Sequence, residues 1–143
     1  GRWIAYESNE SGKYEIYVRP FPDVNNGKWQ VSTGGGDSPL WSHDGRELFY
    51  HSGDAAMAVA VETMPTFKPG KPVMLFRGAY YRGAFGTTDL TYWDISPDDK
   101  RFLMIKPPAS TGATTAAPAP RQKINIVLNW TEELKQRVPI KYK

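Results

Sequence analysis

Residues 42–50 read Ser-His-Asp-Gly-Arg-Glu-Leu-Phe-Tyr, and residues 96–104 read Ser-Pro-Asp-Asp-Lys-Arg-Phe-Leu-Met. The chain begins Gly-Arg-Trp-Ile-Ala-Tyr, which matches the same phrase from its glycine onward. Aligning the three copies makes Gly1, Gly45 and Asp99 equivalent. Each copy has polar turn residues followed by large apolar ones, so the phrase predicts a turn that leads into a β-strand.

The spacing of the copies indicates the fold class. A turn-and-strand phrase that returns about every 40–50 residues is typical of β-propeller blades. The Asp44-Gly45 pair is a strong hairpin signal, because glycine adopts positive φ without strain. We therefore expect an all-β fold, a partial β-propeller of about three four-stranded blades. The blade units are expected at about residues 1–33, 38–77 and 88–130.

Two segments depart from the strand pattern. Residues 107–122 are rich in Pro, Ala, Thr and Ser and lack apolar periodicity, which predicts a disordered insertion within the third unit. Residues 131–133 read Thr-Glu-Glu, a capping residue followed by two acidic residues in the first turn of a helix. Pro139 would end that helix. This pattern predicts a short C-terminal helix at 131–138. The whole chain, 1–143, is interpreted as one domain.

Composition indicates a folded, sheet-rich protein. Hydrophobic residues make up 40% of the chain, which is ordinary for a globular domain, and aromatic residues, which pack well on pleated sheets, make up 13%. Thirteen Gly and twelve Pro predict many turns. The chain has no cysteine, so disulfides, thiolate metal sites and a cysteine nucleophile are excluded.

Charge and hydropathy narrow the range of partners. The formal net charge is only +3, and no run of basic residues exceeds two, so we do not expect nucleic-acid binding. No apolar run approaches the length of a membrane span, and no signal peptide is recognisable at the N-terminus. The first residue already lies inside a repeat, so we expect the sequence to be a piece of a longer protein.

The repeat resembles that of a known family. Residues 41–46, Trp-Ser-His-Asp-Gly-Arg, resemble the W-S-P-D-G-K/R repeat of TolB-like β-propeller proteins, and residues 95–100 form a second, degenerate copy. Residues 16–18, Ile-Tyr-Val, resemble the middle strand of that repeat. His43 replaces the proline of the repeat and Asp99 replaces its glycine, and neither change should prevent the turn.

The C-terminal region carries a related resemblance. Residues 126–134 are similar to the end of propeller domains linked to bacterial serine/threonine kinases. The resemblance implies a sensing or interaction module in a periplasmic or extracytoplasmic location. No kinase motif is present in the chain, and no cofactor is expected.

An arc of three blades exposes strand edges and blade faces, which recruit other chains. Family members close about six blades, so two copies of this chain would complete a ring. We therefore expect closure by homo-oligomerisation, with a homodimer as the leading hypothesis and a higher oligomer as the alternative. The C-terminal segment of one copy, Pro139 to Lys143, could supply a missing strand to the first unit of its partner.

Neither a catalytic nor a metal site emerges from the motifs. Ser42, His43 and Asp44 contain the residue types of a catalytic triad, but they are adjacent in the repeat turn, and a triad requires convergence in space. We interpret Ser42, His43, Asp44 and Gly45 as turn residues. His43 and His51 are the only histidines, lack metal-ligand spacing, and are interpreted as surface residues.

The second copy is interpreted in the same way, with Ser96, Pro97, Asp98 and Asp99 as its turn residues. The three acidic residues at positions 94, 98 and 99 do not form a full set of oxygen ligands for Ca²⁺.

One aromatic group is a candidate ligand site. Tyr80, Tyr81, Tyr92 and Trp93 cluster in the sequence with Arg82 between them, and aromatic rings with a few charged groups can bind sugars or peptides at the mouth of a propeller. The alternative is that these aromatic residues pack within and between blades.

The function expected from these observations is non-enzymatic. We expect a β-propeller scaffold for protein–protein interaction or ligand sensing that assembles with itself and binds a protein or small-molecule ligand. The rival hypothesis is a hydrolase, an esterase or glycan-processing enzyme, with a site at a subunit interface or in a central channel. Structural self-assembly without a ligand is a third possibility.

Overall fold

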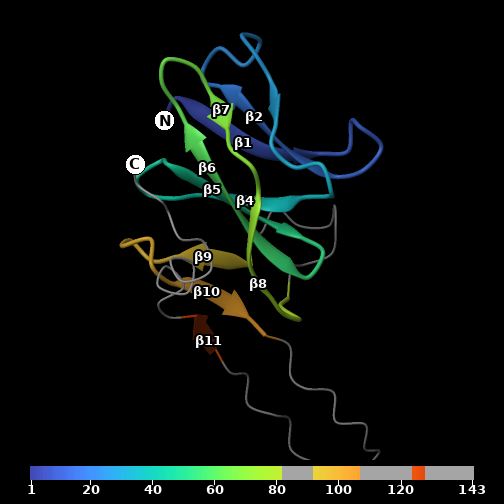
Figure 1. Cartoon of the computed structure of the whole chain (residues 1–143), viewed down its shortest axis with the longest axis vertical. Coiled ribbons are helices and arrows are strands. Elements are labelled where there is room, and N and C mark those ends of the chain that lie inside the picture. The colour runs from blue at the N-terminus through green and yellow to red at the C-terminus, as the bar shows by residue number, and fades with distance from the viewer. Residues whose placement is uncertain (82–91, 107–123, 128–143) are drawn as a thin grey trace, which may run out of the picture. The chain divides into compact units, whose positions relative to one another are not determined.

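A computed structural model describes residues 1–81, 92–106 and 124–127, and every regular element in them is a β-strand (Figure 1). The prediction of an all-β fold is confirmed for these residues. The helix predicted at 131–138 and the insertion predicted at 107–122 lie outside the described residues.

The chain divides into two compact units, and the first, Gly1–Gly78, holds two antiparallel sheets. Sheet 1 has the strand order β1-β2-β3. Its strands are β1 (Trp3–Ser8), β2 (Glu15–Pro20) and β3 (Trp29–Gln30). Strand β1 pairs with β2 along its whole length, while β3 contributes a short third strand.

Sheet 2 is a larger antiparallel meander with the order β4-β5-β6-β7, and β8 also pairs with β6. Its strands are β4 (Asp37–Trp41), β5 (Glu47–Ser52), β6 (Ala55–Glu62), β7 (Lys68–Pro69) and β8 (Val73–Arg77). Strand β7 pairs with the end of β6 and β8 with its beginning, so the two short strands share the fourth position of the sheet.

The second unit, Ala79–Lys143, holds sheet 3, whose order is β11-β10-β9. Its strands are β9 (Trp93–Ile95), β10 (Phe102–Ile105) and β11 (Ile124–Val127). Alternate residues of β10 are buried and exposed, which is the two-residue period of a strand with one covered face.

The repeated phrase occupies the same place in all three sheets. Strand β5 follows Gly45 as β1 follows Gly1, and β10 follows Asp99 in the same way. Equivalent positions are therefore Ile4, Leu48 and Phe102 at the start, with residues 6, 50 and 104 two places later. We call the face that carries these positions face A, and the opposite face of each sheet face B.

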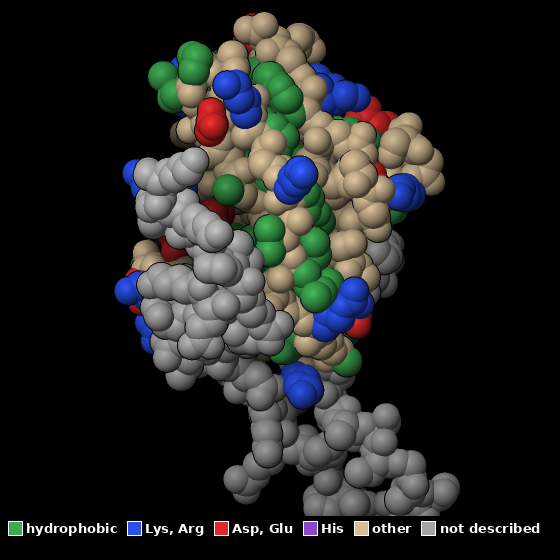
Figure 2. Space-filling model, in the orientation of Figure 1, with side chains coloured by type: hydrophobic (Ala, Val, Ile, Leu, Met, Phe, Trp, Pro, Cys, Tyr) green, Lys and Arg blue, Asp and Glu red, His purple; other side chains and the backbone are tan. Residues whose placement is uncertain are grey.

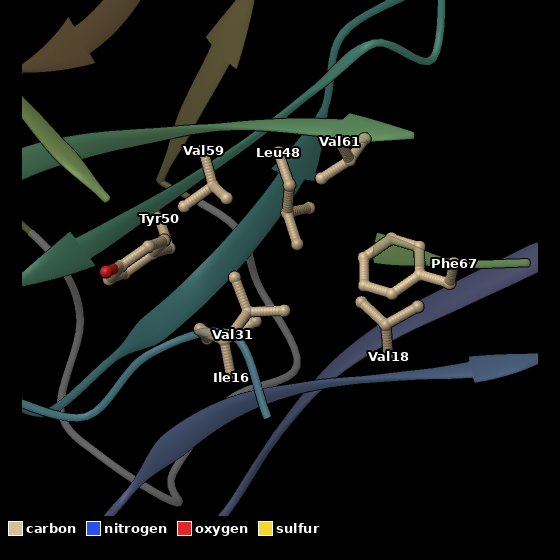
Figure 3. Packing of buried hydrophobic residues seen from close by; sticks show 8 residues of the cluster. All are labelled: Ile16, Val18, Val31, Leu48, Tyr50, Val59, Val61 and Phe67. Carbon is tan, nitrogen blue, oxygen red and sulfur yellow. The ribbon is translucent and has the colours of Figure 1, made fainter. Parts of the chain in front are cut away.

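The core of the first unit lies between sheets 1 and 2 (Figure 3). Its buried members come from strands of both sheets and from the segments after them: Ile16, Val18, Val31, Leu48, Tyr50, Val59, Val61 and Phe67. Figure 3 shows Ile16 of β2 pointing toward Leu48 of β5, and Val18 of β2 pointing toward Phe67. Because interiors of this kind are close-packed, the two sheets fix each other's position within this unit.

The two sheets contribute opposite faces to this core. Sheet 1 packs Trp3 and Ala5, which lie on face B, whereas sheet 2 packs Leu48 and Tyr50, which lie on face A. In a sandwich of two sheets related by a two-fold axis, face A of one sheet would pack on face A of the other, or face B on face B. Sheets 1 and 2 are instead stacked front to back.

Strand β5 is buried on both faces, because Phe49 is 0% exposed on face B and the neighbouring Leu48 is 0% exposed on face A. His51, also on face B, is 4% exposed. The expectation that His51 is a surface residue was wrong, because its place in the central part of sheet 2 buries it. His43, in contrast, is exposed.

A buried carboxylate fixes the segment that joins the two sheets. Glu15, whose side chain is 0% exposed, accepts hydrogen bonds from the Ser32 hydroxyl and, at 3.1 Å, from the Gly35 N–H. Lys13 Nζ lies 3.1 Å from Glu15 Oε1 and donates to the Thr33 carbonyl at 2.8 Å. Burial alone would raise the pKa of Glu15, but the hydrogen bonds from Ser32, Lys13 and Gly35 together lower it below its ordinary value of 4.5.

We predict that Glu15 stabilises the fold only while it is ionised. Because its pKa is lowered on folding, its contribution is present above about pH 4.5 and is lost as the pH falls through the folded-state pKa. Glu15→Gln should lower the free energy of unfolding at neutral pH by about 1–3 kcal/mol and flatten its dependence on acid. Urea unfolding at a series of pH values measures both effects.

Glu62→Gln is the matched control, because the Glu62 side chain is 70% exposed. Its Oε2 atom lies 3.7 Å from Nζ of Lys68, whose side chain is also exposed. Its effect on stability should be within about 0.5 kcal/mol. Equal losses in the two variants, or an unchanged acid profile in Glu15→Gln, would contradict the role given to Glu15.

Candidate functional site

The first turn predicted from the repeat is built around the hydroxyl of Ser42. This hydroxyl donates to Asp44 Oδ1 at 2.8 Å and accepts from the backbone N–H groups of Arg46 and Glu47 at 3.1 and 2.9 Å. Asp44 Oδ1 also accepts from the Arg46 N–H at 3.0 Å. Gly45 N–H donates to the Ser42 carbonyl at 3.1 Å and closes the turn.

The second copy repeats this arrangement. The Ser96 hydroxyl donates to Asp98 Oδ1 at 2.5 Å and accepts from the Arg101 N–H at 3.0 Å. Asp99 N–H donates to the Ser96 carbonyl at 2.8 Å. The hydrogen bond from Ser96, with a further one from the Lys100 N–H, lowers the pKa of Asp98. The two copies are therefore the same structural turn despite their different sequences.

These contacts define the chemistry of the turn residues. The hydroxyl of Ser42 is used by the turn and donates to Asp44, so the Ser-His-Asp sequence does not form the hydrogen-bonded order of a catalytic triad. His43 and Pro97 occupy the same exposed place in the two turns. Among the residues that the structure describes, no three His, Asp or Glu side chains are grouped closely enough to hold a metal ion.

The aromatic residues predicted as a ligand site fall into two groups. Trp93 is 5% exposed, and its ring stacks on Phe102 with centroids 5.2 Å apart, so it belongs to the core of sheet 3. Tyr81, which is 49% exposed, forms an edge-to-face pair with Tyr92 at 4.8 Å. Tyr80 is partly exposed, and Arg82 lies outside the described residues.

A pocket that the sequence analysis did not identify lies within the first unit. It has a volume of about 400 Å³, which is in the range of small-molecule and peptide side-chain sites. Its lining comes from the start of the chain, the repeat turn and the end of β6: Gly1, Arg2, Trp3, Trp41, Asp44, Gly45, Thr63 and Met64. Arg2 and Asp44 place opposite charges at this pocket, and Arg2 Nη1 lies 2.7 Å from Met64 Sδ.

The two tryptophans that line the pocket pack against a buried aromatic ring. Phe67, which is 1% exposed, contacts the rings of Trp3, Trp29 and Trp41 with centroid distances of 5.4, 5.7 and 6.3 Å. The indole Nε1 atoms of Trp3 and Trp41 are buried and have no hydrogen-bond partner among the residues that the structure describes. An indole N–H can only donate, so a ligand that brings an oxygen acceptor within reach would satisfy a buried donor beside this pocket.

The sequence held one signal for this pocket. Trp3 and Trp41 both flank copies of the repeated phrase, one after its glycine and one before its serine. Their spacing along the chain does not reveal that the stacking of sheets 1 and 2 brings them to the same place.

Comparison with protein-family models and with curated proteins finds no match for the chain. The TolB-like resemblance therefore stays a prediction from the repeat. Within the part of the chain that the structure describes, there is no helix with the length and apolar character needed to cross a membrane.

We predict that the turn tolerates aspartate better than alanine at the glycine position. Gly45 has φ of 69° and Asp99, its equivalent, has φ of 55°. A Cβ at Gly45 would meet no atom within 4 Å, so only backbone conformation opposes a side chain there. Gly45→Ala should lower the free energy of unfolding by about 1–2 kcal/mol, and Gly45→Asp by clearly less, because Asp is at home in this conformation.

Urea unfolding followed by tryptophan fluorescence compares the two variants. If Gly45→Asp lowered the free energy of unfolding as much as Gly45→Ala, the backbone conformation of the turn would not explain the aspartate at position 99.

Proposed function

We propose that this chain is a β-propeller scaffold for protein–protein interaction or ligand sensing, and that two copies close into one ring. The front-to-back stacking of sheets 1 and 2 is the single observation that carries the proposal. A stack in which face B of one sheet covers face A of the next can be extended by the same step, which is how blades succeed one another in a propeller.

The other described sheets support the same step. Sheet 2 is buried on its face B as well as on its face A, through Phe49 and His51. Sheet 3 buries its face A, through Phe102 and Met104, which is the face that sheet 2 also buries in the core of the first unit. A repeated unit that uses the same face in each copy favours a continuing stack over a closed two-sheet sandwich.

Exposed apolar side chains on sheets 3 and 1 are the candidates for self-association in this proposal. Leu103 and Ile105 lie on face B of sheet 3 and are 48% and 52% exposed. Ile4, on face A of sheet 1, is 42% exposed. Figure 2 shows hydrophobic side chains in view on the surface of the described residues, among single Lys and Arg side chains. Because face B of sheet 1 covers face A of sheet 2 in the packed pair, we expect Leu103 and Ile105 of one copy to pack against Ile4 of the other.

In a closed dimer, the contact between sheet 3 of one copy and sheet 1 of the other occurs twice. Two copies related by a two-fold axis would each place sheet 3 against sheet 1 of the other, and no face would remain open. With about three blades in each chain, the ring would have about six blades. The pocket beside Trp3 and Trp41 then gives this scaffold a candidate ligand site within each copy.

We predict that Ile105→Glu converts the dimer into a monomer, because the carboxylate would be buried without a partner in the interface. Sedimentation equilibrium at micromolar concentration should give twice the 16.1 kDa of one chain for the native sequence and 16.1 kDa for the variant.

Met74→Glu is the matched control, because Met74 is a similarly exposed apolar residue, 46%, on β8 and not on either of the two faces. It should remain dimeric. A native chain that sediments as a monomer, or an Ile105→Glu variant that stays dimeric, would overturn the proposed closure.

A further inference from the structure

One exposed loop of the first unit contains an asparagine that is followed by glycine. The loop joins β2 to β3 and reads Phe-Pro-Asp-Val-Asn-Asn-Gly-Lys at residues 21–28. Asn25 and Asn26 are both exposed, and Gly27 is partly exposed. Because glycine has no side chain to shield its backbone nitrogen, this nitrogen can reach the side-chain carbonyl of the residue before it. Asn26 and Gly27 are therefore a candidate pair for a reaction within the chain.

Neither reacting group of this pair is held by another part of the described structure. Among the described residues, no hydrogen bond takes the side-chain amide of Asn26 or the N–H of Gly27. The backbone N–H of Asn26 donates to the Asp23 carbonyl at 3.1 Å, which fixes the turn and leaves the side chain unbound. The side-chain amide is thus free to turn toward the Gly27 nitrogen, and this nitrogen is free to lose its proton.

Asn25 is also exposed, but its surroundings oppose the same reaction. The nitrogen that would attack its side chain belongs to Asn26, and that N–H donates to the Asp23 carbonyl. A donor that is engaged in a hydrogen bond gives up its proton less readily. The attacking residue would also carry a side chain, whereas Gly27 carries none. The two adjacent asparagines should therefore differ in reactivity although both are exposed.

Asp44-Gly45 in the repeat turn is the only other place in the chain where asparagine or aspartate precedes glycine. There the attacking nitrogen, that of Gly45, donates to the Ser42 carbonyl at 3.1 Å. The Asp44 carboxylate is held as well, because its Oδ1 accepts from the Ser42 hydroxyl at 2.8 Å and from the Arg46 N–H at 3.0 Å. The fold thus protects this pair and leaves the pair in the loop open.

The structure also requires the glycine that makes Asn26 reactive. Gly27 has φ of 123°, a conformation that favours glycine, and a Cβ on it would lie 2.5 Å from Cη2 of Trp29. The Trp29 ring in turn contacts that of Trp3 edge to face, with centroids 5.4 Å apart. A larger residue at position 27 would therefore disturb the aromatic packing of the first unit.

We propose that Asn26 is a site of spontaneous deamidation in the folded protein. The Gly27 nitrogen bonds to Cγ of Asn26, the bond from Cγ to the side-chain nitrogen breaks, and ammonia leaves with the proton of the Gly27 N–H. The intermediate is a succinimide ring, which water then opens. Attack of water at Cγ gives aspartate, and attack at the main-chain carbonyl gives isoaspartate, in which the backbone runs through Cγ. Either product carries a carboxylate at position 26.

The reaction changes both charge and backbone in this loop. The formal net charge of the chain, +3, falls by one. The isoaspartyl product adds a methylene group to the backbone directly before Gly27, against which Trp29 is closely packed. This product should displace the Trp29 ring from its contact with Trp3, so the tryptophan emission of the separated isoaspartyl form should differ from that of the native chain.

This modification goes beyond the proposed function, because it concerns the loop between β2 and β3 and does not depend on ring closure or on ligand binding. It is detected in the chain alone, from the masses of its peptides. Failure of the deamidation proposal and failure of the scaffold proposal are therefore separate results.

Peptide mapping by mass spectrometry tests the site. After incubation of the native chain at mildly alkaline pH, trypsin gives peptide 14–28, which contains both asparagines, and peptide 29–46, which contains the repeat turn. Deamidation raises the mass of peptide 14–28 by about 1 Da, and fragmentation should place this change at Asn26. Asn26 should react at least about tenfold faster than Asn25, an effect of the size expected from one hydrogen bond.

Two glutamine variants provide the matched controls, and both should fold like the native chain because both positions are exposed. Asn26→Gln should abolish the mass change, because the longer side chain would have to close a larger and less favourable ring. Asn25→Gln keeps the reacting pair, so it should leave the rate at Asn26 within about twofold of the native rate.

The chain unfolded in guanidinium chloride separates the effect of structure from that of sequence. Unfolding removes the hydrogen bonds that protect Asp44-Gly45, so Asp44 should isomerise at least about tenfold faster than in the folded chain. Peptide 29–46 would then elute as two species of equal mass. The rate at Asn26 should change by about threefold or less, because no hydrogen bond of the reacting groups is lost.

The proposal would be wrong if peptide 14–28 of the folded native chain kept its mass while that of the unfolded chain gained it. Equal rates at Asn25 and Asn26, or a mass change that persisted in Asn26→Gln, would also contradict it. Isomerisation of Asp44 at the same rate in the folded and unfolded chains would show that hydrogen bonding of the attacking nitrogen does not decide which pair reacts.

Discussion

Burial of both faces of β5 is the constraint on which the rest of this fold depends. Leu48 and Tyr50 fill one side of the strand, and Phe49 and His51 are buried on the other. A sheet with apolar residues on only one face can end a structure, but a sheet that is apolar on both faces needs a neighbour on each. Sheet 1 meets this need on face A, and it does so with its own face B.

A local device makes each sheet similar enough to its neighbours for this stacking to repeat. The Ser42 hydroxyl donates to an aspartate and accepts from two backbone N–H groups, and the Ser96 hydroxyl donates to an aspartate and accepts from one. The second copy keeps the serine and the aspartate and changes the residues around them. Because the hydrogen bonds reside in these two side chains and the backbone, histidine and proline are both accommodated at the exposed place between them.

The candidate ligand site lies within the first unit, beside the start of β1 and the repeat turn that precedes β5. Arg2 and Trp3 line the pocket from one side of the sequence, and Trp41 and Asp44 from the other. Among the described residues, the buried indole Nε1 atoms of Trp3 and Trp41 have no hydrogen-bond partner. Packing of sheet 1 on sheet 2 therefore brings together an apolar pocket, two opposite charges and two donors without an acceptor.

The sequence by itself determined the strands, the turns and their repetition. Period-two alternation, the Asp44-Gly45 pair and the returning phrase are local signals, and each depends only on residues close together in the chain. The turn at Asp99 was predictable for the same reason, because aspartate tolerates the backbone conformation that glycine has in the first copy.

Only the tertiary structure decided which faces are covered and which residues meet. Alternation along β5 does not say that both of its faces are buried, so His51 was misplaced on the surface. Trp93 appeared among candidate ligand residues because an aromatic cluster in the sequence does not distinguish a core from a binding site. The pocket was missed because Trp3 and Trp41 are far apart in the chain. They come together only through packing of one sheet on another, and long-range packing of this kind leaves no short-range pattern in a sequence.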